Sequence, residues 1–248
     1  FICAFFVALA TLRVPALKSE AIFRAGRYVA TQPPGRRYLA LATGSHLFAL
    51  VLNYGAIQLL GSMIERFMGT ERDPEIAAIR QRRMLLAIQR GFLASVLWSP
   101  LAFGPIISIA LVPGASWGSL LPFGLWHVVI YTAAGWALDT AIKPKVSQRP
   151  PRRPSDGGLS DLLPLFVLLV VTLGGVGIIE LATGLRMAAI VIVFVPLVAI
   201  GWMLLDAEAG GRLRSLGQQV SRFVNSELPD YRSELVLLIM AGYIGATG

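Results

Sequence analysis

Two polar positions interrupt long apolar runs of this chain and could bind a small ion. Asn53 opens an Asn-Tyr-Gly motif near the centre of the apolar stretch 38–64, and Ser99 precedes a proline inside the apolar stretch 84–112. A broken helix exposes N–H groups and a partial positive charge at one half-helix end and free carbonyls at the other, so it can hold an anion or coordinate a cation. The candidate substrate-binding residues are Asn53, Tyr54, Gly55, Ser99 and Pro100.

A second pair of residues is a candidate for ion coupling. His46 lies seven residues before Asn53, nearly two helical turns, so both side chains can lie on one side of a helix. Histidine changes charge near neutral pH, which suits proton coupling, and Ser45 adjoins it. The alternative for His46 is a neutral side chain that hydrogen-bonds an adjacent helix. His127, in the middle of the stretch 117–142, is a weaker functional candidate.

Other kinds of site are excluded by the residue types. These spans hold no dense cluster of carboxylates, so a chain of proton-relay acids is not expected. A single cysteine excludes a disulfide framework and a zinc site built from Cys ligands. We therefore expect a site of backbone dipoles and a few polar side chains, with no cofactor or bound metal beyond Na⁺ or H⁺ as the coupling ion.

The composition predicts that membrane helices position these residues. Of the 248 residues, 55% are hydrophobic and only 15% are charged, against about 25% charged in soluble domains. Several apolar runs reach the roughly 20 residues that span a bilayer. We expect an all-α polytopic membrane protein with spans at 1–12, 38–64, 84–112, 117–142, 159–181, 187–205 and from 235 onward.

The basic residues indicate how these spans are threaded. The net charge of +8 comes from Lys and Arg that lie almost wholly between the apolar runs, where the positive-inside rule places them, so no nucleic-acid partner is needed. If 38–64 crossed the membrane once, the basic loops 13–37 and 66–83 would face opposite sides. A re-entrant hairpin makes every basic loop cytoplasmic and leaves only Arg186 outside.

Each break has a simpler alternative. A continuous tilted helix could use Asn53 to hydrogen-bond a neighbour and Gly55 to approach it closely. The stretch 84–112 would be about 43 Å long as one helix, longer than the hydrocarbon core of about 30 Å, and contains Pro100 and Pro105. These prolines favour a discontinuous helix. The alternative is a simple proline kink in which Ser99 hydrogen-bonds the backbone group that the proline frees.

Three further segments have a structural interpretation. The stretch 17–31, with apolar Leu17, Ala21, Ile22, Ala25 and Val29, predicts an amphipathic helix on the cytoplasmic surface. The glycines of 174–177 follow no strand and predict helix packing instead of a nucleotide loop. Both ends of the chain fall within apolar runs, so we expect a fragment.

The order of these elements resembles a known family. The amphipathic stretch, then LVLNYGAIQLL (50–60), RGFLASVLWSPLAFGP (90–105) and SELVLLIMAGYIGATG (233–248), is similar to the first half and the opening of the second half of the ion transporter superfamily. That superfamily includes divalent-anion/sodium symporters, citrate-type carriers and arsenite-type permeases. The resemblance implies broken transmembrane helices, a re-entrant hairpin and half of an inverted-repeat transporter. The first repeat would be 1–142, the Pro/Arg-rich cytoplasmic linker 143–158, and the truncated second repeat 159–248; a homodimer is also implied.

The leading functional hypothesis is a secondary transporter. Two interrupted apolar segments are a sequence pointer to a transporter binding site at the membrane midplane. We expect a small anion or organic acid to move by alternating access, coupled to H⁺ or Na⁺, in a bacterial inner (plasma) membrane. One alternative is an intramembrane enzyme with His46 or His127 as base, which lacks a recognisable nucleophile or acid partner. Another is a non-transporting membrane scaffold, which would need no polar break.

Overall fold

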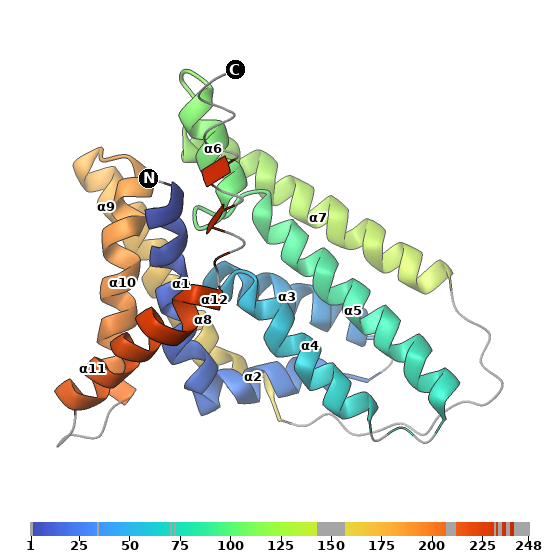
Figure 1. The fold of residues 1–248 in the computed structure, drawn as a ribbon. Helices are drawn as coiled ribbons and strands as arrows, with labels where there is room; N and C mark the ends of the chain where they lie inside the picture. The colour runs from blue at the N-terminus through green and yellow to red at the C-terminus, as the bar shows by residue number, and fades with distance from the viewer. Residues whose placement is uncertain are drawn as a thin grey trace. The chain divides into compact units, whose positions relative to one another are not determined.

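A computed structural model describes residues 2–33, 35–69, 71, 73–142, 157–206 and 212–230, and the single positions 232, 235–236 and 239–240. Within these ranges every regular element is a helix (Figure 1). The all-α prediction is therefore confirmed. Most of the predicted span from 235 onward and nearly all of the linker 143–158 lie outside the described residues. The bounds are α1 Ile2–Lys18, α2 Glu20–Ala30, α3 Arg37–Leu52, α4 Gly55–Met68, α5 Pro74–Val96, α6 Phe103–Leu111, α7 Trp117–Ala141, η1 Leu159–Leu162, α8 Leu163–Leu169, η2 Val170–Gly174, α9 Gly175–Thr183, α10 Met187–Asp206, α11 Arg212–Arg222, η3 Phe223–Glu227 and α12 Leu228–Asp230.

The chain folds into two compact units. The central unit is Ser19–Val170, and the discontinuous unit joins Phe1–Lys18 to Val171–Gly248. In the discontinuous unit α1 packs along α10. In the central unit α8 packs against α2 and α3. The compact units thus divide the chain at other positions than the predicted repeats, whose inverted relationship stays a prediction.

Helix α3 is the core of the central unit. It contacts α2, α4, α5, α7 and α8, and its Leu41 and Phe48 side chains are fully buried. Two glycines allow this close packing. Gly44 of α3 meets the Val29 side chain of α2, and a Cβ at Gly91 of α5 would overlap the backbone carbonyl of Ala42. Because the α3 and α5 backbones touch there, the first interrupted segment is held directly against the second.

The amphipathic helix predicted at 17–31 is confirmed as α2. Ser19 caps it, since its hydroxyl accepts a hydrogen bond from the Ile22 N–H at 3.5 Å. Ile22, Ala25 and Val29 are buried as predicted, whereas Leu17 lies in the last turn of α1 and is 41% exposed. The apolar face of α2 covers α3 and α4, because Gly26 lies against Met63 and Leu60.

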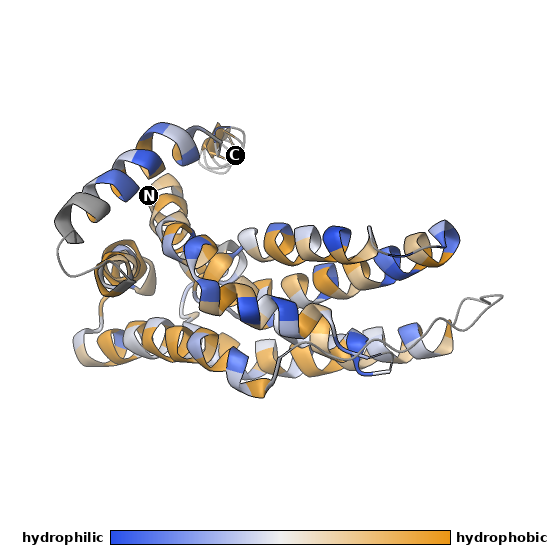
Figure 2. Cartoon of the chain, turned by 90° about the horizontal axis from the view of Figure 1, so that it is seen from below, coloured by the Kyte–Doolittle hydropathy of each residue, from blue (hydrophilic) through white to orange (hydrophobic). Residues whose placement is uncertain are grey.

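Three helical stretches are long and apolar enough to cross a membrane. They are Trp117–Ala141, Leu159–Thr183 and Met187–Leu205, close to three of the predicted spans. Large apolar side chains on them stay exposed, among them Phe123 at 68%, Ile178 at 69% and Val193 at 63%. Hydrophobic residues predominate along most of the helices (Figure 2). An exposed apolar surface of this extent is typical of lipid contact, so the structure supports an integral membrane protein.

The stretch Leu159–Thr183 is not a uniform α-helix. A π-helical segment, Val170–Gly174, separates α8 from α9. Directly after it, a Cβ at Gly175 would overlap the ring of Phe194 on α10. The glycines of 174–177 therefore lie within helices, and Gly175 provides the close packing that was expected of them.

Candidate functional site

The first break lies where the sequence places it, at Asn53. Helix α3 ends at Leu52 and α4 begins at Gly55. Asn53 has φ 50° and ψ −127° and is the one non-glycine residue with positive φ among those described. Its N–H donates to the Ala49 carbonyl at 3.0 Å, and its carbonyl accepts from the Ala56 N–H at 3.1 Å. The helix is therefore interrupted, and the continuous-helix alternative is wrong.

The side chains at this break are free of local hydrogen bonds. The Asn53 amide makes no hydrogen bond to any residue that the structure describes. Tyr54 is 52% exposed, and its ring lies 5.0 Å from the ring of Phe92 on α5. Gly55 is buried at the N-terminus of α4, a helix with no side-chain cap. The N–H groups of Ala56, Ile57 and Gln58 already donate to the Asn53 and Tyr54 carbonyls, so the Asn53 amide and the Gly55 N–H are the groups available to a ligand.

The second break separates α5 from α6. Helix α5 ends at Val96 and α6 begins at Phe103, so the segment is discontinuous and not simply kinked. The buried Ser99 hydroxyl oxygen accepts a hydrogen bond from the Leu101 N–H at 3.1 Å, and the Ser99 carbonyl accepts from the Ala102 N–H at 3.0 Å. Pro100 is buried beside it. Ser99 thus stabilises the non-helical turn while its own O–H stays available to donate.

Trp117 holds this turn in place. Its indole N–H donates to the Trp98 carbonyl at 2.9 Å. A Cβ at Gly124 would overlap the Trp98 side chain, so α7 packs directly on the break. Sequence reasoning misses Trp117, whose only signal is an aromatic residue directly after the turn at 113–116.

His46 belongs to the second break instead of the first. The Trp98 indole N–H donates to His46 Nε2 at 3.3 Å, and the two rings stack with centroids 5.9 Å apart. An indole N–H can only donate, so a neutral His46 must carry its proton on Nδ1. That Nδ1 is buried without a hydrogen-bond partner among the described residues. His46 does bond a neighbouring segment, as its alternative interpretation predicts, and its ring also lies against the Gly91 backbone of α5.

The two breaks follow helices that run in the same direction. Arg37 at the start of α3 lies beside Arg80 and Arg83 in the first half of α5, and His46 near the end of α3 contacts Trp98 directly after α5. Tyr54, in the turn after α3, contacts Phe92 near the end of α5. We call these two facing segments, 46–54 and 92–99, the paired-break region. It contains the predicted substrate-binding residues Asn53, Tyr54 and Ser99, and Gly55 and Pro100 directly follow its two segments.

Ser45 and His127 lie in other surroundings. The Ser45 hydroxyl is fully buried and donates to the Ile88 carbonyl at 2.8 Å, which ties α3 to α5. His127 is exposed on α7, and its Nδ1 lies 2.7 Å from the Phe123 carbonyl of the same helix. Neither side chain reaches the paired-break region through a hydrogen bond that the structure describes.

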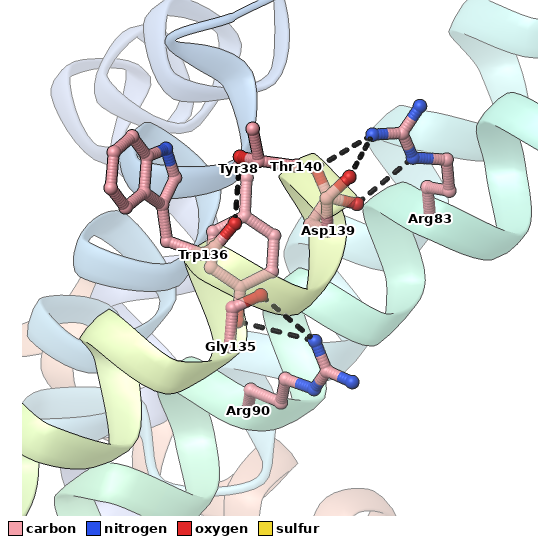
Figure 3. Close-up of polar contacts among 7 residues, drawn as sticks. All are labelled: Tyr38, Arg83, Arg90, Gly135, Trp136, Asp139 and Thr140. Atoms are coloured by element: carbon pink, nitrogen blue, oxygen red, sulfur yellow. Dashed lines mark hydrogen bonds and ion pairs between the residues drawn. The ribbon is translucent and has the colours of Figure 1, made fainter. Parts of the chain in front are cut away.

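A polar network joins α3, α5 and α7 away from the breaks (Figure 3). Arg83 donates to both carboxylate oxygens of Asp139, at 2.9 and 2.7 Å, and to the Asp139 carbonyl at 2.9 Å. Arg90 donates to the Gly135 carbonyl at 3.4 Å and to the Tyr38 hydroxyl at 3.5 Å. Asp139 therefore has a structural role, because its carboxylate ties α7 to α5.

Comparisons of the chain with protein-family models, with curated proteins and with solved structures found no match. Among the described residues no group of three or more His, Cys, Asp or Glu side chains could hold a metal ion.

Proposed function

We propose that this protein is a secondary transporter that moves a small anion or organic acid by alternating access. One observation carries the proposal: two interrupted helices, α3 and α5, lie against each other, and each break carries a donor that bonds no acceptor among the described residues. These donors are the Asn53 amide and the Ser99 hydroxyl. Donors without acceptors favour a negatively charged ligand, because each would otherwise lose its hydrogen bond to water without replacement.

The helix ends add to this preference. Helix α4 begins at Gly55, close after Asn53, and places the Gly55 N–H and the positive end of the helix dipole there. Substrate would therefore be held by backbone dipoles and amide or hydroxyl donors, with Tyr54 and Pro100 shaping the region. The same arrangement is the one that broken-helix transporters use at the membrane midplane.

Proton coupling would act through His46. Protonation at Nε2 turns this acceptor into a donor, which is incompatible with the hydrogen bond that it accepts from Trp98. Loss of that bond would free Trp98, which belongs to the turn between α5 and α6. A proton would thereby change the second break at the same region where substrate binds, while Na⁺ would have the Asn53 side-chain oxygen as a ligand.

The topology completes the proposal. The segment 38–64 would be a re-entrant hairpin with its tip at Asn53, so that the basic stretches on either side face the cytoplasm. The chain would form half of an inverted-repeat transporter of a bacterial inner membrane, and a homodimer would be consistent with this architecture.

The test is uptake of labelled anions into proteoliposomes. With a panel of inorganic oxyanions and small carboxylates, we expect uptake by the unaltered protein. Asn53→Ala and Ser99→Ala should each lower it about 10-fold or more, the loss expected for one hydrogen bond to a charged ligand. Ser62→Ala is the matched control, because this exposed serine bonds only within α4, to the Leu59 carbonyl. Unchanged uptake in both site variants would overturn the site, and no uptake of any anion would overturn the function.

A further inference from the structure

A cluster of arginines at one end of α3 and α5 is not used by the proposed transport site. It comprises Arg37 at the start of α3 and Arg80 and Arg83 on α5. Arg80 pairs with Glu71, and Arg83 pairs with Asp139. Both carboxylates are thus already engaged by a guanidinium. Arg37 has no carboxylate within ion-pair distance among the described residues.

Arg37 is held by one hydrogen bond, and the donors on its two terminal nitrogens are free among the described residues. Its Nε–H donates to the Gln32 carbonyl at 2.9 Å, which fixes the guanidinium plane. Its two terminal nitrogens make no hydrogen bond to any part of the chain that the structure describes. A fixed guanidinium with both terminal nitrogens free matches the bidentate geometry with which arginine binds phosphate.

The electrostatic surroundings of Arg37 are unfavourable without an anion. Burial, followed by the positive charges of Arg80 and Arg83, lowers the pKa of Arg37 to about 10. The preceding residue, Arg36, is exposed and makes no side-chain cap on α3, so another positive charge and an uncapped helix N-terminus lie beside it. A bound anion would relieve this accumulation of positive charge.

An apolar surface adjoins the cluster. The last turns of α7 supply Gly135 and Asp139 to Arg90 and Arg83, and the same turns expose Trp136 at 43%, Leu138 at 50% and Ile142 at 71%. A free phosphate ion does not bind an apolar surface. A phospholipid binds both a basic site, through its headgroup, and an adjoining apolar surface, through its acyl chains.

We propose that Arg37, together with Arg80 and Arg83, binds the phosphate group of an anionic phospholipid whose acyl chains lie along the end of α7. Arg37 supplies the bidentate contact, and the two paired arginines supply positive potential. This site is separate from the paired-break region and does not depend on the transport proposal.

The experiment is thermal unfolding of the whole chain in detergent micelles with phosphatidylglycerol, phosphatidylcholine or inorganic phosphate added. We expect phosphatidylglycerol to raise the Tm by about 5 °C, as for a ligand well above its Kd. Phosphatidylcholine and inorganic phosphate should raise it by less than half as much. A response to phosphate as large as that to phosphatidylglycerol would overturn the lipid assignment in favour of a free anion.

Three variants locate the site. Arg37→Gln should abolish the phosphatidylglycerol response, and Arg37→Lys should retain only part of it, since lysine cannot bind bidentately. Arg82→Gln, which removes one charge from an exposed position of the same helix, should respond as the unaltered protein does. In phosphatidylcholine alone, Arg37→Gln should unfold at the same or a higher temperature, which shows that the variant folds. Equal phosphatidylglycerol responses in Arg37→Gln and the unaltered protein would overturn the proposal.

Discussion

At the scale of single residues, a buried polar group that stabilises packing has a hydrogen-bond partner within the protein, whereas one that binds a ligand keeps a donor or acceptor free. Ser45 is buried and its hydroxyl donates to the Ile88 carbonyl, so it contributes to packing. His46, the next residue, has a buried Nδ1 beside the Gly91 backbone that makes no hydrogen bond of good geometry to the described residues. An unsatisfied buried donor costs free energy, roughly 1–3 kcal/mol, and therefore marks a position where a ligand can supply the missing acceptor.

Gly91 tests the contact between α3 and α5 at this scale. A Cβ there would overlap the Ala42 carbonyl, and a backbone carbonyl cannot move aside as a side chain can. Gly91→Ala should lower the free energy of unfolding by about 1–3 kcal/mol or more. Gly177→Ala is the control, because open space surrounds Gly177, and alanine there should be neutral or stabilise α9 by about 0.4–1 kcal/mol. Denaturant unfolding in micelles measures both, and similar values for the two variants would contradict the contact.

At the scale of elements, the second break depends on groups outside its own sequence. Proline and glycine interrupt the helix, but the conformation of residues 97–102 is maintained by Ser99 within the turn and by Trp117 from α7. Pro105 falls in the first turn of α6, where its missing N–H is not needed. The break is thus a defined structure that connects α5, α6 and α7.

Trp117 offers a test of that connection. Trp117→Phe keeps the aromatic ring and removes the N–H that donates to the Trp98 carbonyl. Stability should fall by about 0.5–1.5 kcal/mol, and anion uptake should fall with it, because the turn would be less well ordered. Trp136→Phe is the matched control, since the exposed Trp136 indole makes no hydrogen bond that the structure describes. Equal effects of the two substitutions would show that the indole hydrogen bond is unimportant.

At the scale of the whole molecule, the open question is whether the segment 38–64 forms a re-entrant hairpin or crosses the membrane once. The break at Asn53 permits both, because a helix can change direction at a break without returning to the side from which it came. The charge distribution favours the hairpin, since the basic residues on both sides of 38–64 would then face the cytoplasm.

Single cysteines in a Cys3→Ser background test this threading. Arg36→Cys and Glu75→Cys, which flank the α3–α4 segment at exposed positions, should react with an impermeant maleimide from the cytoplasmic side only. Pro113→Cys and Leu185→Cys, also exposed, should react only from the opposite side. Labelling of positions 36 and 75 from different sides would exclude the re-entrant hairpin.

The sequence by itself determined the all-helical class, three of the predicted apolar spans and the positions of both breaks. These features follow from local chemistry: the hydropathy of each run, the missing N–H of Pro100 and Pro105, and the tolerance of Asn53 for positive φ. The amphipathic pattern of α2 is local as well, so Ile22, Ala25 and Val29 were identifiable as buried.

Only the tertiary structure decided which of these features meet. His46 and Trp98 are 52 positions apart, and Arg83 and Asp139 are 56 apart. The packing of α1 with α10 brings together two helices that lie far apart in the sequence. Such contacts depend on how side chains fit between helices, for instance on the space that Gly91 leaves for Ala42, and periodicity within one helix carries no information about its partner.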